Sequence, residues 1–307
     1  ANTTGTYNTT TGMSSLAANT TGGYNTGNGA YALTANTTAD NNTAVGAYAL
    51  TANTTGTQNT AVGKSALAAN TTATEGTAVG RDALLSNTTG EGNTGLGKAA
   101  MQDNTTGSYN AAAGLNALSN NTTADNNTAF GVNAMLVNTT GANNVAIGRS
   151  ALDANTTAAG NTAVGMDALT TNTTGASNVG LGSGALFSNT TATENTAVGF
   201  NCLYTITTGI NNVAVGSNSN GNNNTGSYNT SVGTNSLSAA SSASNNTAVG
   251  YLALAANTSG TSNLAIGVSA LGGVTTGGDN IGIGREAGKN SVALNGGANT
   301  VIGNYPD

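Results

Sequence analysis

A seventeen-residue pattern of apolar and polar positions repeats along this chain. The segment that begins at Asn59 reads NTAVGKSALAANTTATE, and seventeen such units run from Asn8 to Asn280 without insertion or deletion. We number the positions of a unit as slots one to seventeen, with the Asn of NTAVG at slot one. A short fixed period of this kind is typical of solenoids, in which each unit forms one structural repeat.

The pattern within a unit predicts short strands joined by tight arcs. Asn-Thr-Thr and Gly would interrupt any helix longer than a turn or two. Strand residues alternate between two faces, so slots two and four share one side and slot three takes the other. We expect slots two and four to point inward and slot nine to add a second apolar layer. The predicted core residues are Val45, Val62 and Val79 at slot four and Leu50, Leu67 and Leu84 at slot nine.

These patterns predict an all-β fold. No single unit could bury its apolar residues alone, so we expect residues 1–284 to form a parallel β-solenoid of about 18 coils in total. Residues 285–307 depart from the period, because nineteen residues separate Gly284 from the equivalent Gly303. We therefore expect an irregular terminal coil there, which serves as a cap or a docking segment.

One slot is invariant. Slot five is Gly in all seventeen units, which predicts a backbone position that needs φ > 0 or a close approach that excludes Cβ. The representative turn glycines are Gly46, Gly63, Gly80, Gly148, Gly165 and Gly250.

Asn recurs at two slots. Slot one is Asn in sixteen of seventeen units, with Gly76 as the exception, and slot twelve is Asn in twelve consecutive units from Asn2 to Asn189. We expect both sets of amides to stack coil on coil as hydrogen-bonded ladders. The representative ladder residues are Asn42, Asn59 and Asn93 at slot one and Asn53, Asn70 and Asn87 at slot twelve.

Slots three and eight hold small residues. Slot three is Ala, Gly, Ser or Thr throughout, and slot eight is Ala in thirteen units. Two interpretations are open. Either a tight coil leaves no room for larger side chains, or another chain lies flat against this stripe in a bundle of parallel solenoids.

Composition limits the chemistry. The chain has 307 residues, of which 6% are charged, and it contains no His and one Cys. Without His it lacks the usual general base and the commonest metal ligand, and Cys202 alone cannot form an intrachain disulfide or a thiolate cluster. A net charge of −6 with six basic residues disfavours a nucleic-acid partner. No apolar stretch approaches the roughly 18 residues of a membrane span. We therefore predict a protein that is not an enzyme, uses no cofactor or metal, and does not insert into membranes.

The Asn-Thr-Thr segments allow two further interpretations. With Asn at slot twelve they match the N-glycosylation pattern, although an Asn ladder beside Thr produces the same letters for structural reasons. The Thr residues that follow, at slots thirteen and fourteen, form stacked ranks along most of the chain. These ranks suggest ice binding by stacked hydroxyls, whereas turn chemistry is the simpler explanation. The residues concerned are Asn36, Asn138 and Asn155 for glycosylation and Thr54, Thr71 and Thr88 for the rank.

The repeat also resembles known families. NNVAIG at residues 143–148, NLAIG at residues 263–267 and the many NTAVG units resemble the head repeat of trimeric autotransporter adhesins. The whole unit is similar to repeat arrays in phage and bacterial tail-fibre-like proteins. The resemblance covers nearly the whole chain. It implies a left-handed parallel β-roll, usually with three chains side by side, on a cell or virion surface.

Two functions follow as hypotheses. The first is a non-enzymatic structural or adhesive protein, an extracellular fibre shaft or filament subunit built by side-by-side trimerisation or head-to-tail stacking. Its expected partners are further copies of itself, in a homotrimer or a head-to-tail polymer, and surface glycans or a host surface. The second is an ice-binding β-solenoid that uses stacked Thr.

Overall fold

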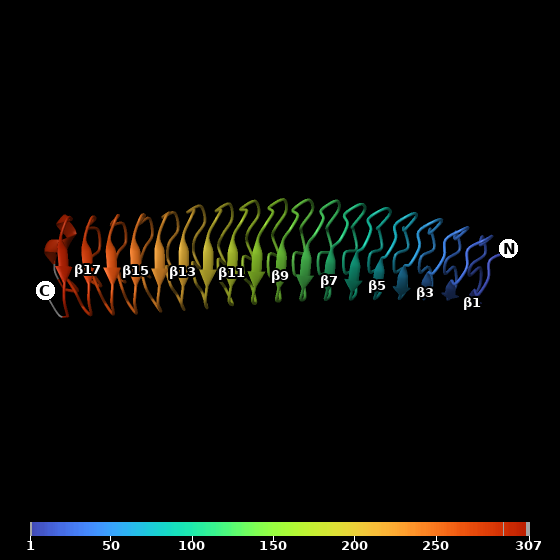
Figure 1. The fold of residues 1–307 in the computed structure, drawn as a ribbon, viewed down its shortest axis with the longest axis horizontal. Coiled ribbons are helices and arrows are strands. Elements are labelled where there is room, and N and C mark those ends of the chain that lie inside the picture. Colours follow the sequence, from blue (N-terminus) through green and yellow to red (C-terminus); the bar gives the residue numbers. More distant parts are fainter. Residues whose placement is uncertain (1, 291, 305–307) are drawn as a thin grey trace. The chain divides into compact units, whose positions relative to one another are not determined.

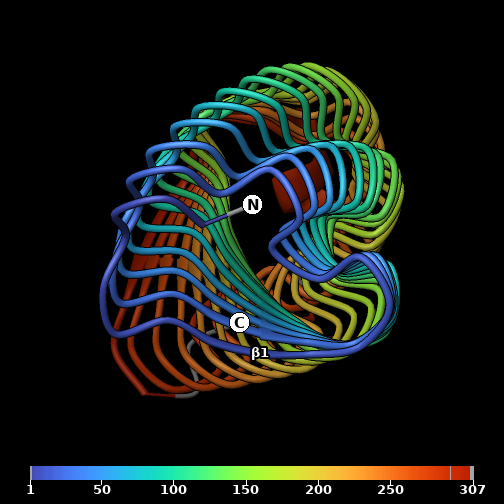
Figure 2. The same ribbon diagram turned by 90° about the vertical axis from the view of Figure 1, so that its right-hand side faces the viewer.

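The chain folds into two compact parts, residues 1–157 and residues 158–307, which we call the first and the second unit from here on. The seventeen-residue repeats within them are called coils. The computed structural model describes residues 2–290 and 292–304. Each unit is a stack of coils, and each regular coil contributes one strand of three residues (Figure 1). In Figure 2, the successive coils of residues 1–157, coloured blue to green, follow nearly the same path.

The strands fall on slots two to four of every repeat. The first unit holds β1 (Thr9–Thr11), β2 (Thr26–Asn28), β3 (Thr43–Val45), β4 (Thr60–Val62), β5 (Thr77–Val79), β6 (Thr94–Leu96), β7 (Ala111–Ala113), β8 (Thr128–Phe130) and β9 (Val145–Ile147). The second holds β10 (Thr162–Val164), β11 (Val179–Leu181), β12 (Thr196–Val198), β13 (Val213–Val215), β14 (Thr230–Val232), β15 (Thr247–Val249), β16 (Leu264–Ile266), β17 (Ile281–Ile283) and β18 (Thr300–Ile302).

Successive strands within a unit pair in parallel, with each slot beside its own counterpart. In β3 and β4, for example, Ala44 pairs with Ala61 and Val45 with Val62, a register of seventeen residues. The prediction of an all-β parallel β-solenoid is therefore confirmed. The left-handedness that the family resemblance implies stays a prediction.

The predicted orientation of the strands is wrong. Slot three is the buried position, as the fully buried Ala44, Ala61 and Ala78 show, whereas slots two and four point outward. Of the predicted slot-four core residues, Val45 and Val62 are only partly buried and Val79 is 40% exposed. The reason is space: facing parts of a narrow coil lie close together, and the strand side that faces inward has room for Ala but not for Val.

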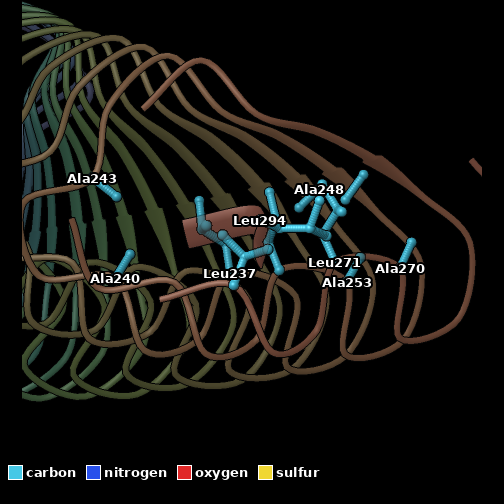
Figure 3. Close-up of a cluster of buried hydrophobic side chains, with 11 residues drawn as sticks. Leu237, Ala240, Ala243, Ala248, Ala253, Ala270, Leu271 and Leu294 are labelled. Carbon is cyan, nitrogen blue, oxygen red and sulfur yellow. The ribbon is translucent and has the colours of Figure 1, made fainter. Parts of the chain in front are cut away.

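The core consists of small residues packed against one large residue per coil. Slots three and eight are buried almost throughout, and the slot-nine residues Leu50, Leu67 and Leu84 have no exposed surface. Figure 3 shows residues at the same slots in the second unit, where Ala248, Ala253, Leu237 and Leu271 belong to one buried cluster. Since slots three and eight both point inward, the hypothesis of a small-residue docking stripe is wrong, and the tight coil explains their size.

Three slots per coil adopt the left-handed conformation without needing Gly. Tyr48 at slot seven, Leu50 at slot nine and Gln58 at slot seventeen have φ of 62°, 51° and 61°. The same slots have positive φ in every regular coil. This conformation costs about 1–2 kcal/mol per residue.

Hydrogen bonds along the stack offset that cost. The N–H of Tyr48 donates to Ala30 O at 2.9 Å, that of Leu50 to Ala66 O at 3.0 Å and that of Gln58 to Asp40 O at 3.2 Å. Each left-handed residue thus turns its N–H toward a neighbouring coil. The backbone bends sharply there without leaving a buried donor unpaired.

Slot five requires Gly on two counts. The six predicted turn glycines have φ between 135° and 139°, far from the range of L-residues. In addition, a Cβ at Gly63 would lie 2.5 Å from Gly80 O and 2.7 Å from Gly80 C. The backbones of successive coils therefore touch at this slot, and a side chain would force them apart.

The two Asn ladders exist and share an acceptor. At slot one, the N–H of Asn59 donates to Asn42 Oδ1 at 3.0 Å. At slot twelve, Asn70 Nδ2 donates to Asn53 Oδ1 at 2.8 Å. Both Asn59 Nδ2 and Asn70 Nδ2 then donate to the carbonyl oxygen of Ala73, at 2.9 and 3.1 Å. The ladders tie two sides of each coil to the arc between them.

The remaining predicted ladder residues take part in the same way. Asn42 Nδ2 donates to Gly56 O at 2.9 Å and Asn93 Nδ2 to Gly107 O at 2.7 Å. Asn53 Nδ2 donates to Asn36 Oδ1 at 3.0 Å and Asn87 Nδ2 to Asn70 Oδ1 at 3.4 Å. The only gap in the slot-one ladder of the first unit is Gly76, which donates its N–H to Asn59 Oδ1 but has no side-chain oxygen to accept the N–H of Asn93.

The last coil holds two more residues and still returns to the sheet. The 3₁₀ helix η1 (Val292–Gly296) takes up the extra length, and Asn295 Oδ1 accepts the N–H of Thr275 at 2.8 Å. Strand β18 then pairs with β17 in a register of nineteen residues, with Thr300 beside Ile281. Residues 291 and 305–307 of the predicted terminal coil lie outside the described residues.

Two glycine substitutions in neighbouring coils test this account. We expect Gly63→Ala to lower the free energy of unfolding by about 3 kcal/mol or more, because it combines backbone strain with a backbone clash. Gly76→Asn should raise it by about 1 kcal/mol, because the new Oδ1 can accept the N–H of Asn93. Denaturant unfolding followed by circular dichroism measures both. A Gly63→Ala variant as stable as the wild type would contradict the proposed contact.

Candidate functional site

The structure locates the predicted surface features of the Asn-Thr-Thr arc inside the fold. Asn36, Asn138 and Asn155 are fully buried. Their Nδ2 atoms donate to ladder oxygens, for example from Asn36 to Asn19 Oδ1 at 2.8 Å and from Asn155 to Asn138 Oδ1 at 2.8 Å. A glycan on these nitrogens would break the ladder, so the glycosylation hypothesis is wrong for the folded chain at these three residues.

The slot-thirteen Thr rank is structural as well. The hydroxyl groups of Thr54, Thr71 and Thr88 donate to the carbonyl oxygens of Thr71, Thr88 and Thr105, at 3.0, 3.2 and 3.0 Å. Each hydroxyl therefore satisfies the backbone of the next coil. The structure thus gives the slot-thirteen rank a role in the turn, whereas the slot-fourteen Thr beside it, such as Thr72 and Thr89, are exposed. Ice binding by the arc stays a prediction.

Potential metal ligands and the single thiol can be located in the described part of the chain. Over residues 2–290 and 292–304, no group of three or more His, Cys, Asp or Glu is placed to hold a metal ion. Cys202 is fully buried, and burial raises the pKa of its thiol to about 12. The thiol is therefore protonated at neutral pH, and its Sγ donates to Ala214 O at 3.1 Å. No helix among these residues is both long and apolar enough to cross a membrane.

The most extensive surface feature is the outward side of the strands, which we call the strand face. It consists of the side chains at slots two and four. Slot four carries Val, Leu, Ile or Phe in most coils, and no described residue at either slot is charged. The clearly exposed apolar members are Val79, Leu96, Phe130 and Ile147 in the first unit and Val213, Val215, Val232, Ile266 and Ile302 in the second.

Apolar residues at slot six border the strand face. Leu115 and Val132 are 41% and 44% exposed in the first unit, and Phe200 is 55% exposed in the second. Basic residues occupy the same slot elsewhere, as at Lys64, Arg81 and Lys98 in three successive coils. The border of the strand face therefore alternates between apolar and basic stretches, whereas the face itself stays uncharged.

Continuity is what separates the strand face from ordinary surface hydrophobicity. Single exposed apolar residues are normal on soluble proteins, but monomers rarely expose large contiguous apolar patches. Parallel pairing places equivalent residues about 4.7–4.9 Å apart on adjacent strands. Side chains at slot four therefore form a row, which is apolar from Val45 to Ile147 in the first unit and from Val164 to Ile302 in the second. Sequence reasoning missed this surface because it assigned slots two and four to the core.

A polar cluster interrupts the apolar core of the second unit. Ser219 Oγ lies 2.6 Å from Ser231 Oγ and 2.9 Å from Ser236 Oγ. Beside it, Asn220 occupies slot nine in place of Leu and is fully buried. Neither its Nδ2 nor its Oδ1 has a hydrogen-bond partner in the described part of the chain. An unpaired buried amide is costly, so this coil is a weak point of the stack.

The chain matches no protein-family model, no curated protein and no solved structure. The resemblance to adhesin and tail-fibre repeats consequently carries no residue roles to this chain.

Asn220 permits a stability test with a control three residues away. We expect Asn220→Leu to raise the free energy of unfolding by about 1–3 kcal/mol, because it removes an unpaired amide and restores the apolar row. Asn223→Leu should lower it, since Asn223 Nδ2 donates to Gly226 O at 3.0 Å and its Oδ1 accepts the Gly226 N–H at 2.7 Å. Thermal unfolding of both variants gives the comparison, and a destabilised Asn220→Leu would show that the buried amide is satisfied.

Proposed function

We propose that this chain is a non-enzymatic structural or adhesive subunit of an extracellular fibre, whose copies associate side by side through their strand faces. The observation that carries the proposal is the uncharged strand face, whose slot-four row is apolar from Val45 to Ile147 in the first unit. On it Val79, Leu96, Phe130 and Ile147 are all at least 40% exposed. Covering such a surface removes apolar area from water, which is the main favourable term in protein association.

A second copy of the chain is the partner that best fits this face. Any surface that packs well against a row of side chains must match its spacing, and an identical strand face has the same spacing of about 4.7–4.9 Å by construction. Closed rings of identical subunits are also the usual form of soluble oligomers. Because slots two and four carry no charge, the net charge of −6 does not oppose contact at the face itself.

The location and mode of assembly belong to the same proposal. The resemblance to trimeric adhesin heads and tail-fibre repeats supports an extracellular place on a cell or virion surface and three chains per assembly. Head-to-tail stacking of coils remains compatible with contact between strand faces, because the two contacts use different surfaces.

Ice binding is a second candidate for the same face. Slot two holds Thr in six successive coils, from Thr9 to Thr94, and these Thr lie on strands and not in the arc that we first considered. Against it, Ala111 and Val145 interrupt this rank within the first unit. Thermal hysteresis or inhibition of ice recrystallisation by the wild type would support this candidate, and the absence of both would exclude it.

A pair of charge insertions tests the proposed association. We expect the wild type to sediment as a multiple of its 29.5 kDa chain mass. Val79→Glu combined with Leu96→Glu should shift it to monomer, because burying two carboxylates without partners is unfavourable. Thr72 and Thr89, which are exposed at slot fourteen of the neighbouring arcs, provide the matched control: Thr72→Glu with Thr89→Glu should leave the assembly intact.

Sedimentation velocity over a range of concentrations reads out both pairs. Circular dichroism establishes that each variant keeps the β-solenoid. A wild type that is monomeric at all concentrations, or a Val79/Leu96 variant that assembles as well as the wild type, would contradict association through the strand face.

A further inference from the structure

A polar cleft opens in the second unit away from the strand face. Its volume is about 390 Å³, and its lining residues are Asn201, Tyr204, Asn218, Gly221, Asn222, Asn235 and Ser238. They occupy slots seven, ten and eleven of three successive coils. The cleft falls within the usual size range of small-ligand sites, about 300–1,000 Å³.

Gly221 creates the cleft. Slot ten carries a side chain in most coils, including Phe187, Tyr204 and Ser238, but in this coil it carries none. A second cleft, of about 190 Å³, includes Gly272, which also occupies slot ten, in its lining. Loss of a slot-ten side chain therefore leaves a hollow in an otherwise regular surface.

One end of the cleft is aromatic. The ring of Tyr204 stacks on that of Phe187, with centroids 4.8 Å apart and planes inclined by 11°. Phe187, Tyr204 and Gly221 stand at the same slot of successive coils, so Phe187 covers one face of the Tyr204 ring and Gly221 offers no side chain to cover the other. The second face is therefore available as a platform beside the cleft.

One wall of the cleft is a row of amides. Asn201, Asn218 and Asn235 share slot seven, and all three are held in the left-handed conformation with φ between 50° and 54°. Their N–H groups donate to the preceding coil, for example from Asn218 to Phe200 O at 2.9 Å and from Asn235 to Ser217 O at 3.0 Å. The backbone under this wall is therefore fixed, which lowers the entropy cost of binding.

The side-chain amides of this site are free to bind. Those of Asn201, Asn222 and Asn235 make no hydrogen bond within the described part of the chain, and that of Asn218 makes only a long contact of 3.5 Å with Ser217 Oγ. Each Asn offers both donors and an acceptor, and Ser238 adds a hydroxyl group. No lining residue is charged.

We propose that this cleft binds a neutral saccharide. A sugar ring presents hydroxyl groups, which both donate and accept hydrogen bonds, around an apolar face of C–H groups. The amide wall and Ser238 match the hydroxyl groups, and the uncovered face of Tyr204 matches the apolar face. Since the lining has no charge and the chain carries a net charge of −6, acidic sugars gain nothing from the site.

The inference goes beyond the proposed fibre and does not rest on it. The lining residues occupy none of the slots of the strand face, so the site can bind whether or not the chains associate. The cleft would give an adhesive fibre a specific contact with sugars, and a monomeric chain would contain the same cleft.

Filling the cleft gives a direct test. Gly221→Tyr restores a slot-ten side chain. The φ of Gly221 is not left-handed, and a Cβ there would lie 3.2 Å from Asn218 O, a tight contact that requires a small shift of this backbone. Tyr204→Ala removes the platform and leaves Gly221 in place. Gly272→Tyr is the matched control, because it makes the same change at the second cleft, whose lining includes Leu252, Ala255 and Lys289.

The probe is a printed array of neutral gluco-, galacto- and manno-oligosaccharides, with sialylated and sulfated oligosaccharides on the same surface. We expect the wild type to bind at least one neutral oligosaccharide. Gly221→Tyr and Tyr204→Ala should each lose at least tenfold in apparent affinity for it, whereas Gly272→Tyr should stay within twofold of the wild type. Unchanged thermal unfolding establishes that the variants are folded.

Three results would overturn the inference: no binding to any neutral oligosaccharide, binding that requires a charged one, or equal losses in Gly221→Tyr and Gly272→Tyr. None of them bears on association through the strand face, because sedimentation measures that separately.

Discussion

Every coil must lie on the next with each residue beside its own counterpart, because the backbone N–H and C=O groups point along the stack. A single coil is small, so its buried backbone groups can form hydrogen bonds only with the adjacent coils and with side chains in the arcs. The register of seventeen residues seen between Ala44 and Ala61 therefore governs everything else. Gly at slot five allows the backbones of two coils to touch, and the Asn ladders donate hydrogen bonds to the carbonyl oxygens of the arcs. The left-handed residues direct their N–H groups along the stack toward a neighbouring coil.

The period was enough to predict the architecture, but not which side of the strand faces inward. Hydrophobicity alone favoured Val62 over Ala61 for the core, because Val is larger and more apolar. The structure buries Ala61 and leaves Val62 partly exposed, since the width of the coil, and not the hydrophobicity of a single residue, decides what fits. The small residues at slots three and eight were the correct signal, because both slots are buried, and a docking stripe was the wrong explanation for them.

The left-handed positions show where sequence signals are strong and where they are absent. The conformation of Gly46 can be predicted from the sequence, because only Gly tolerates a φ of 136° where another backbone lies so close. The frequent Asn, Asp and Ser at slot seven are a weaker hint, since short polar residues visit this region more readily than others. Leu50 gives no hint at all, and only its hydrogen bond to Ala66 O explains why it has φ of 51°. The cleft at Gly221 was also invisible, because a missing side chain matters only once its neighbours are known.

The same register has a consequence for how the chain reaches this state. The strand and ladder bonds described above join residues about seventeen positions apart, so no contact has to wait for a distant segment of the chain. A completed coil presents an edge of correctly spaced hydrogen-bond donors and acceptors. The following residues can form hydrogen bonds with this edge as they leave the ribosome. Each coil is thus a template for its successor. Nucleating the first pair of coils is the costly event, and elongation afterwards is local and repetitive.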